Sequence, residues 1–163
     1  MTTTNTTSGR LIIMSGIPGS GKSTKAKQIL ADLRANGEKA VIVNRDDLRT
    51  TLFGEDYHKS EPVHEDESDV TSFQHGLISN SLKRGFVVIS DDTNLSPYTL
   101  KKLNKIAKDH GATVEELPVI VPLEVAIERN RLRGASGGRF VPEDVIKSMF
   151  KNQLKSFKAK GLL

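Results

Sequence analysis

A glycine-rich run near the N-terminus has the residue types and spacing of a phosphate-binding loop. Residues 16–23 read Gly-Ile-Pro-Gly-Ser-Gly-Lys-Ser, which fits the pattern G-x-x-x-x-G-K-[ST] in full. Glycines let the backbone curl so that N–H groups point at phosphate oxygens, Lys22 supplies a charge, and the Ser23 hydroxyl can join a Mg²⁺ shell. An ordinary glycine-rich turn is the alternative interpretation. We expect ATP and Mg²⁺ to bind here, with Ser23 on the metal and the nucleotide held by Gly16, Gly19, Ser20, Gly21, Lys22, Ser23 and Thr24.

Two adjacent acids and an arginine follow an apolar run that ends at Val43. Residues 44–49 read Asn-Arg-Asp-Asp-Leu-Arg. One carboxylate there can accept the proton of an attacking hydroxyl, while the other can cap the short helix that follows. Arg49 lies one helical turn beyond Asp46, so it can bind an acceptor phosphate through two hydrogen bonds. The competing interpretation is that Arg49 pairs with a nearby acid on the helix surface.

A second polar cluster follows the next apolar run, where residues 90–94 read Ser-Asp-Asp-Thr-Asn. Acids at the end of a buried strand beside a phosphate loop commonly hold Mg²⁺ through water or orient a basic partner. Asp and Asn also suit turns for purely local reasons. Of these two interpretations, we favour a functional site at residues 90–94.

Four arginines bracket a stretch of small residues at 134–138, namely Arg129, Arg131, Arg133 and Arg139. A helix–loop–helix that carries arginines and hinges on small residues could close over a triphosphate, bring positive charge to the transition state and exclude water. A solvated basic loop is the alternative. We predict a lid.

The elements that must position these residues alternate between short apolar runs and longer helical patterns, which is typical of a parallel α/β domain. Strands are expected at 11–14, 40–43, 86–89 and 113–121, and helices at 23–35, 46–53, 97–109, 123–132 and from Pro142 onward. The last helix places apolar residues at core spacing and lysines outside: Ile146, Met149, Phe150, Leu154 and Phe157 against Lys147, Lys151, Lys155 and Lys158. Residues 54–69 hold seven acids and two of the four histidines, and we expect a solvated, mobile excursion.

Composition limits the classes of protein that the chain can be. Its 163 residues suit one domain, predicted over 10–163, after a Thr-rich disordered tail at 1–9. There is no cysteine, which is compatible with the cytoplasm, and no apolar run approaches the roughly 20 residues of a membrane span. A net charge of +4 leans toward anionic partners, although nucleotides alone would explain it.

Taken together, the motifs resemble the kinase domain of the polynucleotide 5′-hydroxyl kinase family, of which the phage T4 enzyme is the best-known member. The motifs are Gly-x-Pro-Gly-Ser-Gly-Lys-Ser-Thr, Asn-Arg-Asp-Asp-x-x-Arg, Ser-Asp-(Asp)-Thr-Asn-Leu, Arg-Asn-x-x-Arg-Gly, and Val-Pro with a later Ser-Met. The similarity, with the motifs in this order, spans residues 11–157. The resemblance implies a P-loop kinase fold, with a mostly parallel sheet of four or five strands and an arginine-bearing lid.

The resemblance also implies individual roles. Lys22 and Ser23 would contact the ATP phosphates and Mg²⁺, Asp46 would be the general base on the 5′-hydroxyl, and Arg49 would bind the phosphate of the acceptor. The remaining roles fall on Asp92, Thr93 and Asn94 at the acceptor-side wall, and on Arg129 and Arg133 as lid arginines at the donor. The extra acid in the pair at 91–92 leaves the alignment of that wall open by one residue.

The resulting hypothesis is a polynucleotide kinase that moves the γ-phosphate of ATP to a 5′-hydroxyl end of DNA or RNA. A phosphatase domain, which the phage enzyme also carries, is not expected in this chain, and homo-oligomer formation is an option because the phage enzyme is an oligomer. Two alternatives stay open. One is a P-loop kinase of a small molecule or modified base, and the other is a non-catalytic, NTP-dependent switch.

Overall fold

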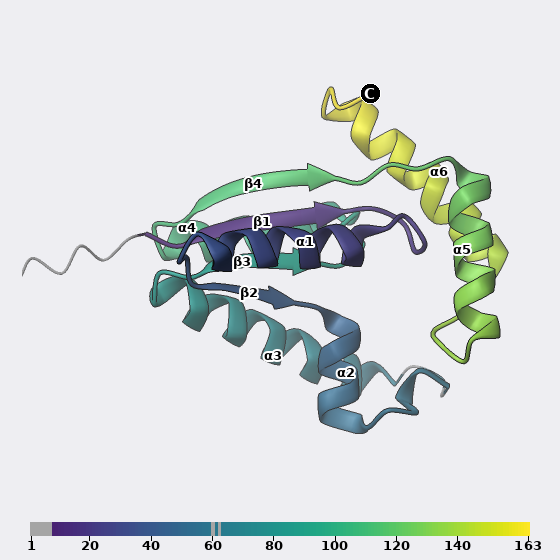
Figure 1. The fold of residues 1–163 in the computed structure, drawn as a ribbon, viewed down its shortest axis with the longest axis horizontal. Helices are drawn as coiled ribbons and strands as arrows, with labels where there is room; N and C mark the ends of the chain where they lie inside the picture. The colour runs from purple at the N-terminus through teal and green to yellow at the C-terminus, as the bar shows by residue number, and fades with distance from the viewer. Residues whose placement is uncertain (1–7, 60, 62) are drawn as a thin grey trace, which may run out of the picture.

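The computed structural model describes residues 8–59, 61 and 63–163, and within them it contains a four-stranded parallel sheet. The strands β1 (Arg10–Ser15), β2 (Ala40–Val43), β3 (Val87–Asp91) and β4 (Thr113–Pro118) lie in the order β2-β3-β1-β4 (Figure 1). All three pairings are parallel, as the alternation of strands and helices predicts. The predicted α/β P-loop fold is therefore confirmed, with four strands among the described residues.

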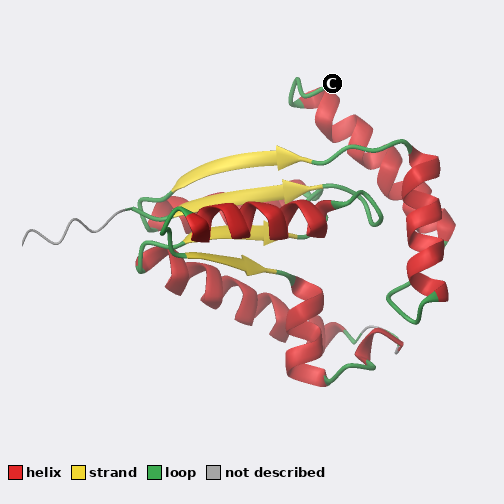
Figure 2. Ribbon diagram, in the orientation of Figure 1, coloured by secondary structure: helices red, strands yellow, loops and turns green. Residues whose placement is uncertain are grey.

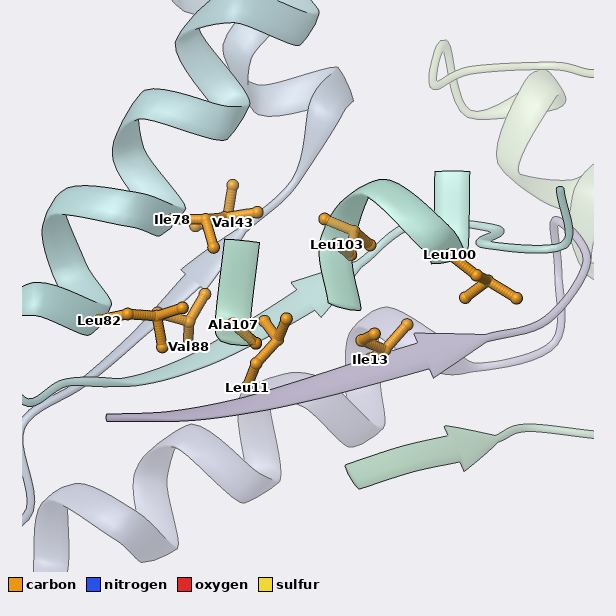
Figure 3. Packing of buried hydrophobic residues seen from close by; sticks show 9 residues of the cluster. All are labelled: Leu11, Ile13, Val43, Ile78, Leu82, Val88, Leu100, Leu103 and Ala107. Atoms are coloured by element: carbon orange, nitrogen blue, oxygen red, sulfur yellow. The ribbon is translucent and has the colours of Figure 1, made fainter. Parts of the chain in front are cut away.

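Both faces of the central strand β1 are covered by helices. Successive side chains of a strand point to opposite faces. Leu11 and Ile13 accordingly join one buried cluster with side chains of α3 (His64–Lys83) and α4 (Pro97–Asp109), which Figure 3 shows. Ile12 and Met14 join another against α1 (Lys22–Ala35). The continuous apolar character of β1 follows from this double burial.

The remaining helices lie beyond the carboxyl ends of the strands (Figure 2). They are α2 (Arg45–Phe53), the short 3₁₀ helix η1 (Tyr57–Lys59), α5 (Leu123–Ala135) and α6 (Glu143–Ala159). A third cluster joins Ile17 of the glycine-rich loop to Ala126 of α5 and Ile146 of α6. The helices that carry the predicted lid are thus packed directly against the phosphate-binding loop.

Several sequence predictions need correction. Residues 54–69 are not simply a solvated excursion, because among their described positions lie η1 and the first turns of α3, a helix of 20 residues that the sequence analysis missed. The fourth strand ends at Pro118 rather than at 121. In α6, Gln153 is fully buried, whereas Leu154 is only partly covered.

The predicted tail falls mainly on residues 1–7, which lie outside the described residues, while Gly9 is buried and its carbonyl accepts a hydrogen bond from the Thr113 N–H at 3.3 Å. None of the helices in the described part of the chain is long and apolar enough to cross a membrane.

Candidate active site

The glycine-rich loop joins the end of β1 to the start of α1 and leaves no room for side chains at two of its glycines. A Cβ on Gly16 would lie 2.7 Å from the Val119 carbonyl oxygen. Gly19 has a φ of 80°, in the left-handed region, and a Cβ there would collide with the Ala126 carbonyl oxygen of α5. Glycine is therefore required by close backbone approach as well as by conformation. The resulting loop wraps the N-terminal end of α1, where anions are favoured.

Lys22 opens α1 at the centre of this site. Burial lowers the pKa of its ammonium group, while the nearby acids Asp91 and Asp92 oppose that shift. Within the described residues Lys22 forms no ion pair at 4.0 Å or less. A partly desolvated cation without a bonded carboxylate is suited to receive an anionic ligand such as a phosphate.

The ends of β2 and β3 are tied together by Asn44. Its side-chain oxygen accepts the Asp47 N–H at 3.0 Å, and its side-chain nitrogen donates to the Asp91 carbonyl at 2.7 Å. Asn44 is therefore the N-cap of α2, and the prediction that one of the two aspartates caps this helix is wrong. Asp47 is exposed, which leaves Asp46 as the acid of the pair that faces the cleft.

Asp46 lies between two arginines that come from different parts of the chain. Its Oδ1 accepts a hydrogen bond from Arg49 at 2.5 Å, and its Oδ2 accepts one from Arg139 at 2.6 Å. Arg139 follows α5, so the predicted lid crosses the cleft and contacts the candidate base. The structure thus brings together the acid and the arginine that the spacing of one helical turn placed on the same face.

Glu67 of α3 also binds Arg49 and was not among the predicted site residues. Arg49 Nε and Nη2 donate to the two Glu67 carboxylate oxygens at 2.7 and 2.9 Å, and Arg45 Nη2 donates to the same carboxylate at 3.0 Å. These bonds, with Arg49 the larger contributor, lower the pKa of Glu67 to about 2 and raise the pKa of Arg49. The proposed pairing of Arg49 with a nearby acid is therefore real, through Glu67 as well as Asp46.

Asp92, directly after β3, is held by α2 and α3, the helices that also carry Arg49 and Glu67. Its Oδ1 accepts the Arg45 N–H and its Oδ2 accepts the Gln74 side-chain amide, each at 3.0 Å. Burial raises the pKa of Asp92 to about 7, against the opposing effect of the Arg45 N–H. The neighbouring Asp91 is itself buried, and its Oδ1 has no hydrogen-bond partner in the protein.

The oxygen atoms near Lys22 fit a magnesium ion bound together with a nucleotide. Ser23, which carries a hydroxyl, and Asp91, whose carboxylate Oδ1 has no hydrogen-bond partner, both line the cleft and offer hard oxygen donors. No cluster of three or more His, Cys, Asp or Glu side chains suited to a metal is found in the described part of the chain. Mg²⁺ commonly takes one or two protein ligands and completes its shell with phosphates and water.

Thr93 and Asn94 connect this wall to the phosphate-binding loop. The Thr93 carbonyl accepts the Gly16 N–H at 3.1 Å, and the Asn94 side-chain nitrogen donates to the Met14 carbonyl at 2.7 Å. Asn94 is buried, but its Oδ1 has no partner within the protein. Both residues line the cleft, and their contacts mainly fix the relative position of β1 and β3.

The lid presents three of its four arginines to the cleft. Arg129 donates to the Gly19 carbonyl at 3.4 Å, and Arg133 donates to the carbonyl of Arg139 at 2.7 Å. Arg131 instead pairs with Glu128 on the exposed side of α5. Buried Asn130 fixes the segment after the arginines, because its side chain exchanges two hydrogen bonds with the Val141 backbone.

These groups surround one cleft of about 560 Å³ at the carboxyl edge of the sheet. It is lined by the glycine-rich loop, the starts of α2 and α4, one side of α3, and the lid. In doubly wound sheets, ligands bind outside the carboxyl ends of the strands. Sequence reasoning had not identified several lining residues, namely Thr71, Gln74 and His75 of α3 and Tyr98, Thr99 and Lys102 of α4.

Comparisons with curated proteins identify kinases as relatives. The L-seryl-tRNA(Sec) kinase of Methanococcus maripaludis is 29% identical over 142 residues, which cover 86% of this chain and 51% of the relative. A protein of Autographa californica nuclear polyhedrosis virus, named as a bifunctional polynucleotide kinase/RNA ligase, is 31% identical over 158 residues, which cover 91% and 21%. The chain thus spans about half of the archaeal relative and about a fifth of the viral one.

Solved structures and a family model agree with these matches. The Pnkp1/Rnl/Hen1 RNA repair complex contains a chain with a TM-score of 0.80 and 26% identity, covering 98% of this chain and 48% of that one. The APS kinase CysC of Mycobacterium tuberculosis, at a TM-score of 0.64 and 20% identity over 82% and 75% of the two chains, shares the fold. The resemblance to polynucleotide kinase domains is confirmed. A family model described as an AAA domain matches residues 11–159, so the chain belongs to this family of P-loop proteins, whose kinase members are phosphotransferases.

Proposed function

We propose that the protein transfers the γ-phosphate of ATP to a 5′-hydroxyl end of a nucleic acid. The observation that carries the proposal is that Asp46, a candidate base, and Arg49, a candidate phosphate ligand, lie together in the cleft that also contains Lys22. The two side chains are joined by a hydrogen bond of 2.5 Å. A base is needed for an organic hydroxyl, and a planar guanidinium suits an acceptor that carries a phosphate. Relatives named for polynucleotide kinase activity and for an RNA repair complex support this acceptor.

Each group has a defined task in this reaction. Lys22 and the loop N–H groups bind the donor phosphates, and Ser23 and Asp91 would hold Mg²⁺, which supplies charge neutralisation at those phosphates. Asp46 takes the proton of the attacking 5′-hydroxyl. Arg129 and Arg133 approach the donor from the lid and stabilise the charge of the transferring group.

Arg49 retains binding capacity although two carboxylates already contact it. A guanidinium has five N–H donors. Glu67 uses two of them and Asp46 uses one, which leaves two for an acceptor phosphate. Glu67 therefore orients the guanidinium without saturating it. Fixing the phosphate on the 3′ side of the reacting sugar would align the 5′-hydroxyl for in-line attack.

The decisive experiment is transfer of labelled γ-phosphate to three acceptors: a 5′-hydroxyl oligonucleotide, a nucleoside 3′-phosphate and an unphosphorylated nucleoside. The proposal requires transfer to the first two and very poor transfer to the third. A matched oligonucleotide that already carries a 5′-phosphate is the control and must stay unlabelled. Transfer to the free nucleoside at the same efficiency would contradict the role of an acceptor phosphate.

A kinase of another hydroxyl acceptor is the second candidate. It is favoured by the match to an L-seryl-tRNA(Sec) kinase, which covers 86% of this chain at 29% identity. Adding seryl-tRNA and small hydroxyl compounds to the same assay distinguishes the two candidates. An NTP-dependent switch would instead hydrolyse ATP slowly and label none of these acceptors.

A further inference from the structure

The first turns of α4 present an aromatic side chain and a lysine that the protein does not use for its own packing. Ser96 caps this helix by accepting the Thr99 N–H at 3.4 Å, and the buried face carries Leu100 and Leu103. Tyr98 and Lys102, one helical turn apart, occupy a different face. The Tyr98 residue is 70% exposed, yet both it and Lys102 line the cleft.

A positively charged side chain lies beside Tyr98. The Lys102 ammonium lies 5.4 Å from the centre of the Tyr98 ring, within the range of a cation–π contact, and forms no ion pair with any described residue. Lys102 and Arg45 also both act on His75 of α3, whose pKa is lowered first by burial and then by their positive charges. This wall of the cleft therefore combines an open ring with a free cation.

Its position is on the acceptor side of the cleft. α4 packs against α3, whose Glu67 binds Arg49, and Lys102 of α4 and Arg45 of α2 both act electrostatically on His75 of α3. The lid arginine at the glycine-rich loop, Arg129, belongs to α5, which follows the opposite edge strand β4. Tyr98 lines the same cleft as Asp46 and Arg49, and its helix packs against α3, so the ring is placed to meet the acceptor.

We infer that Tyr98 stacks on a nucleobase near the 5′ end of the acceptor strand and that Lys102 binds a phosphate of the same strand. Aromatic rings combined with cations along a groove bind single strands without reading sequence, because every base has a π-face and every nucleotide has a phosphate. The inference rests on the proposed function, since it requires a nucleic acid acceptor. It adds a second contact zone to the phosphate contact proposed for Arg49.

The test compares wild type with Tyr98→Ala and Tyr98→Phe on a 5′-hydroxyl oligonucleotide and on the same strand with abasic sites at its first two positions. Tyr98→Ala should lower kcat/KM for the complete strand about tenfold, in line with the loss of one stacked base, and leave the abasic strand nearly unchanged. Tyr98→Phe should behave as wild type. Equal losses of kcat/KM on the complete and abasic strands would overturn the stacking role. A rise confined to the KM of ATP would also overturn it, because it would place the Tyr98 ring at the adenine of the donor.

Binding measured without ATP, by anisotropy of a labelled oligonucleotide, separates this inference from the proposed function. If wild type binds the strand through Tyr98 but never phosphorylates it, the proposed activity fails and the binding zone stands. If wild type phosphorylates the strand with no Tyr98 dependence in either assay, the activity stands and the inference fails. The absence of both binding and transfer would overturn both.

Lys102 has a matched control in its neighbour Lys101, which is exposed but does not line the cleft. The logarithm of the binding constant falls linearly with the logarithm of the salt concentration, and loss of one phosphate contact with a single strand should make that slope less negative by about 0.7. Lys102→Met should show this change and Lys101→Met should not. Equal slopes for the two variants would remove Lys102 from the proposed contact zone.

Discussion

Replacing Glu67 with glutamine should destabilise the protein and remove a defined part of its acid sensitivity. The pKa of Glu67 is about 2 in the folded chain against 4.5 for an ordinary glutamate, a difference worth at most about 3 kcal/mol of folding free energy. The Glu67 side chain is 29% exposed, so solvent screening reduces the expected contribution to about 1–2 kcal/mol. Glu67→Gln should lower the free energy of unfolding at pH 7 by this amount.

The sign of the pH dependence follows from the lowered pKa. The folded state holds Glu67 ionised more strongly than the unfolded state does. Its stabilising contribution is therefore complete above about pH 4.5 and is lost as the pH falls toward about 2. Wild type should lose this stability over that window, while Glu67→Gln should lack this part of the decline.

Glu65→Gln is the matched control, because Glu65 is exposed and lies in the same first turn of α3. It removes the same charge near the same helix N-terminus without touching Arg49. Urea unfolding of the three proteins between pH 7 and pH 2.5 measures both effects. Equal destabilisation by the two substitutions would show that the helix terminus, and not the pairing with Arg49, accounts for the effect, and would refute the reasoning.

Three further predictions concern transfer itself. Lys22→Ala should abolish phosphoryl transfer with little change in the circular dichroism spectrum, and wild-type turnover in that variant would exclude the loop as the donor site. Asp46→Asn should retain ATP binding in calorimetry and lose roughly two to four decades of kcat, whereas Asp47→Asn, at an exposed position, should stay close to wild type; a larger loss at Asp47 would reverse the assignment. Arg49→Ala should erase the preference for a nucleoside 3′-phosphate over the nucleoside by slowing the better acceptor, and an unchanged kcat/KM ratio would remove its phosphate-binding role.

The parts of the site that were predictable from sequence are those encoded by neighbouring residues. The glycine-rich loop is a contiguous motif, and its strand and helix follow it directly in the chain. Asp46 and Arg49 fall on one face because three residues make nearly one helical turn. The helix cap was misassigned because Asn44, Asp46 and Asp47 are all suited to capping, and only the tertiary bond from Asn44 to the Asp91 carbonyl distinguishes them.

The parts that escaped prediction depend on contacts between distant segments. Glu67 is one of seven acids in residues 54–69, and which of them reaches Arg49 depends on where α3 begins. Gln153 shows the same limit at the core. Its side-chain oxygen accepts a hydrogen bond from the Ile17 N–H of the glycine-rich loop at 3.2 Å, although the two residues are 136 positions apart. The polar side chain predicts exposure at position 153, whereas the helical spacing predicts burial, so sequence alone does not decide between them.

The two acids at the end of β3 show how the structure divides roles that spacing left open. Asp91 is the last residue of the strand, lines the cleft, has an unpartnered Oδ1 and acts electrostatically on Lys22, which suits contact with a bound cation. Asp92 lies one residue farther and binds Arg45 and Gln74, so it braces α2 and α3. Because Arg45 also binds Glu67, which binds Arg49, a continuous chain of hydrogen bonds runs from Asp92 to Arg49. Asp92 therefore supports the wall that carries Arg49, while Asp91 keeps an unpartnered oxygen.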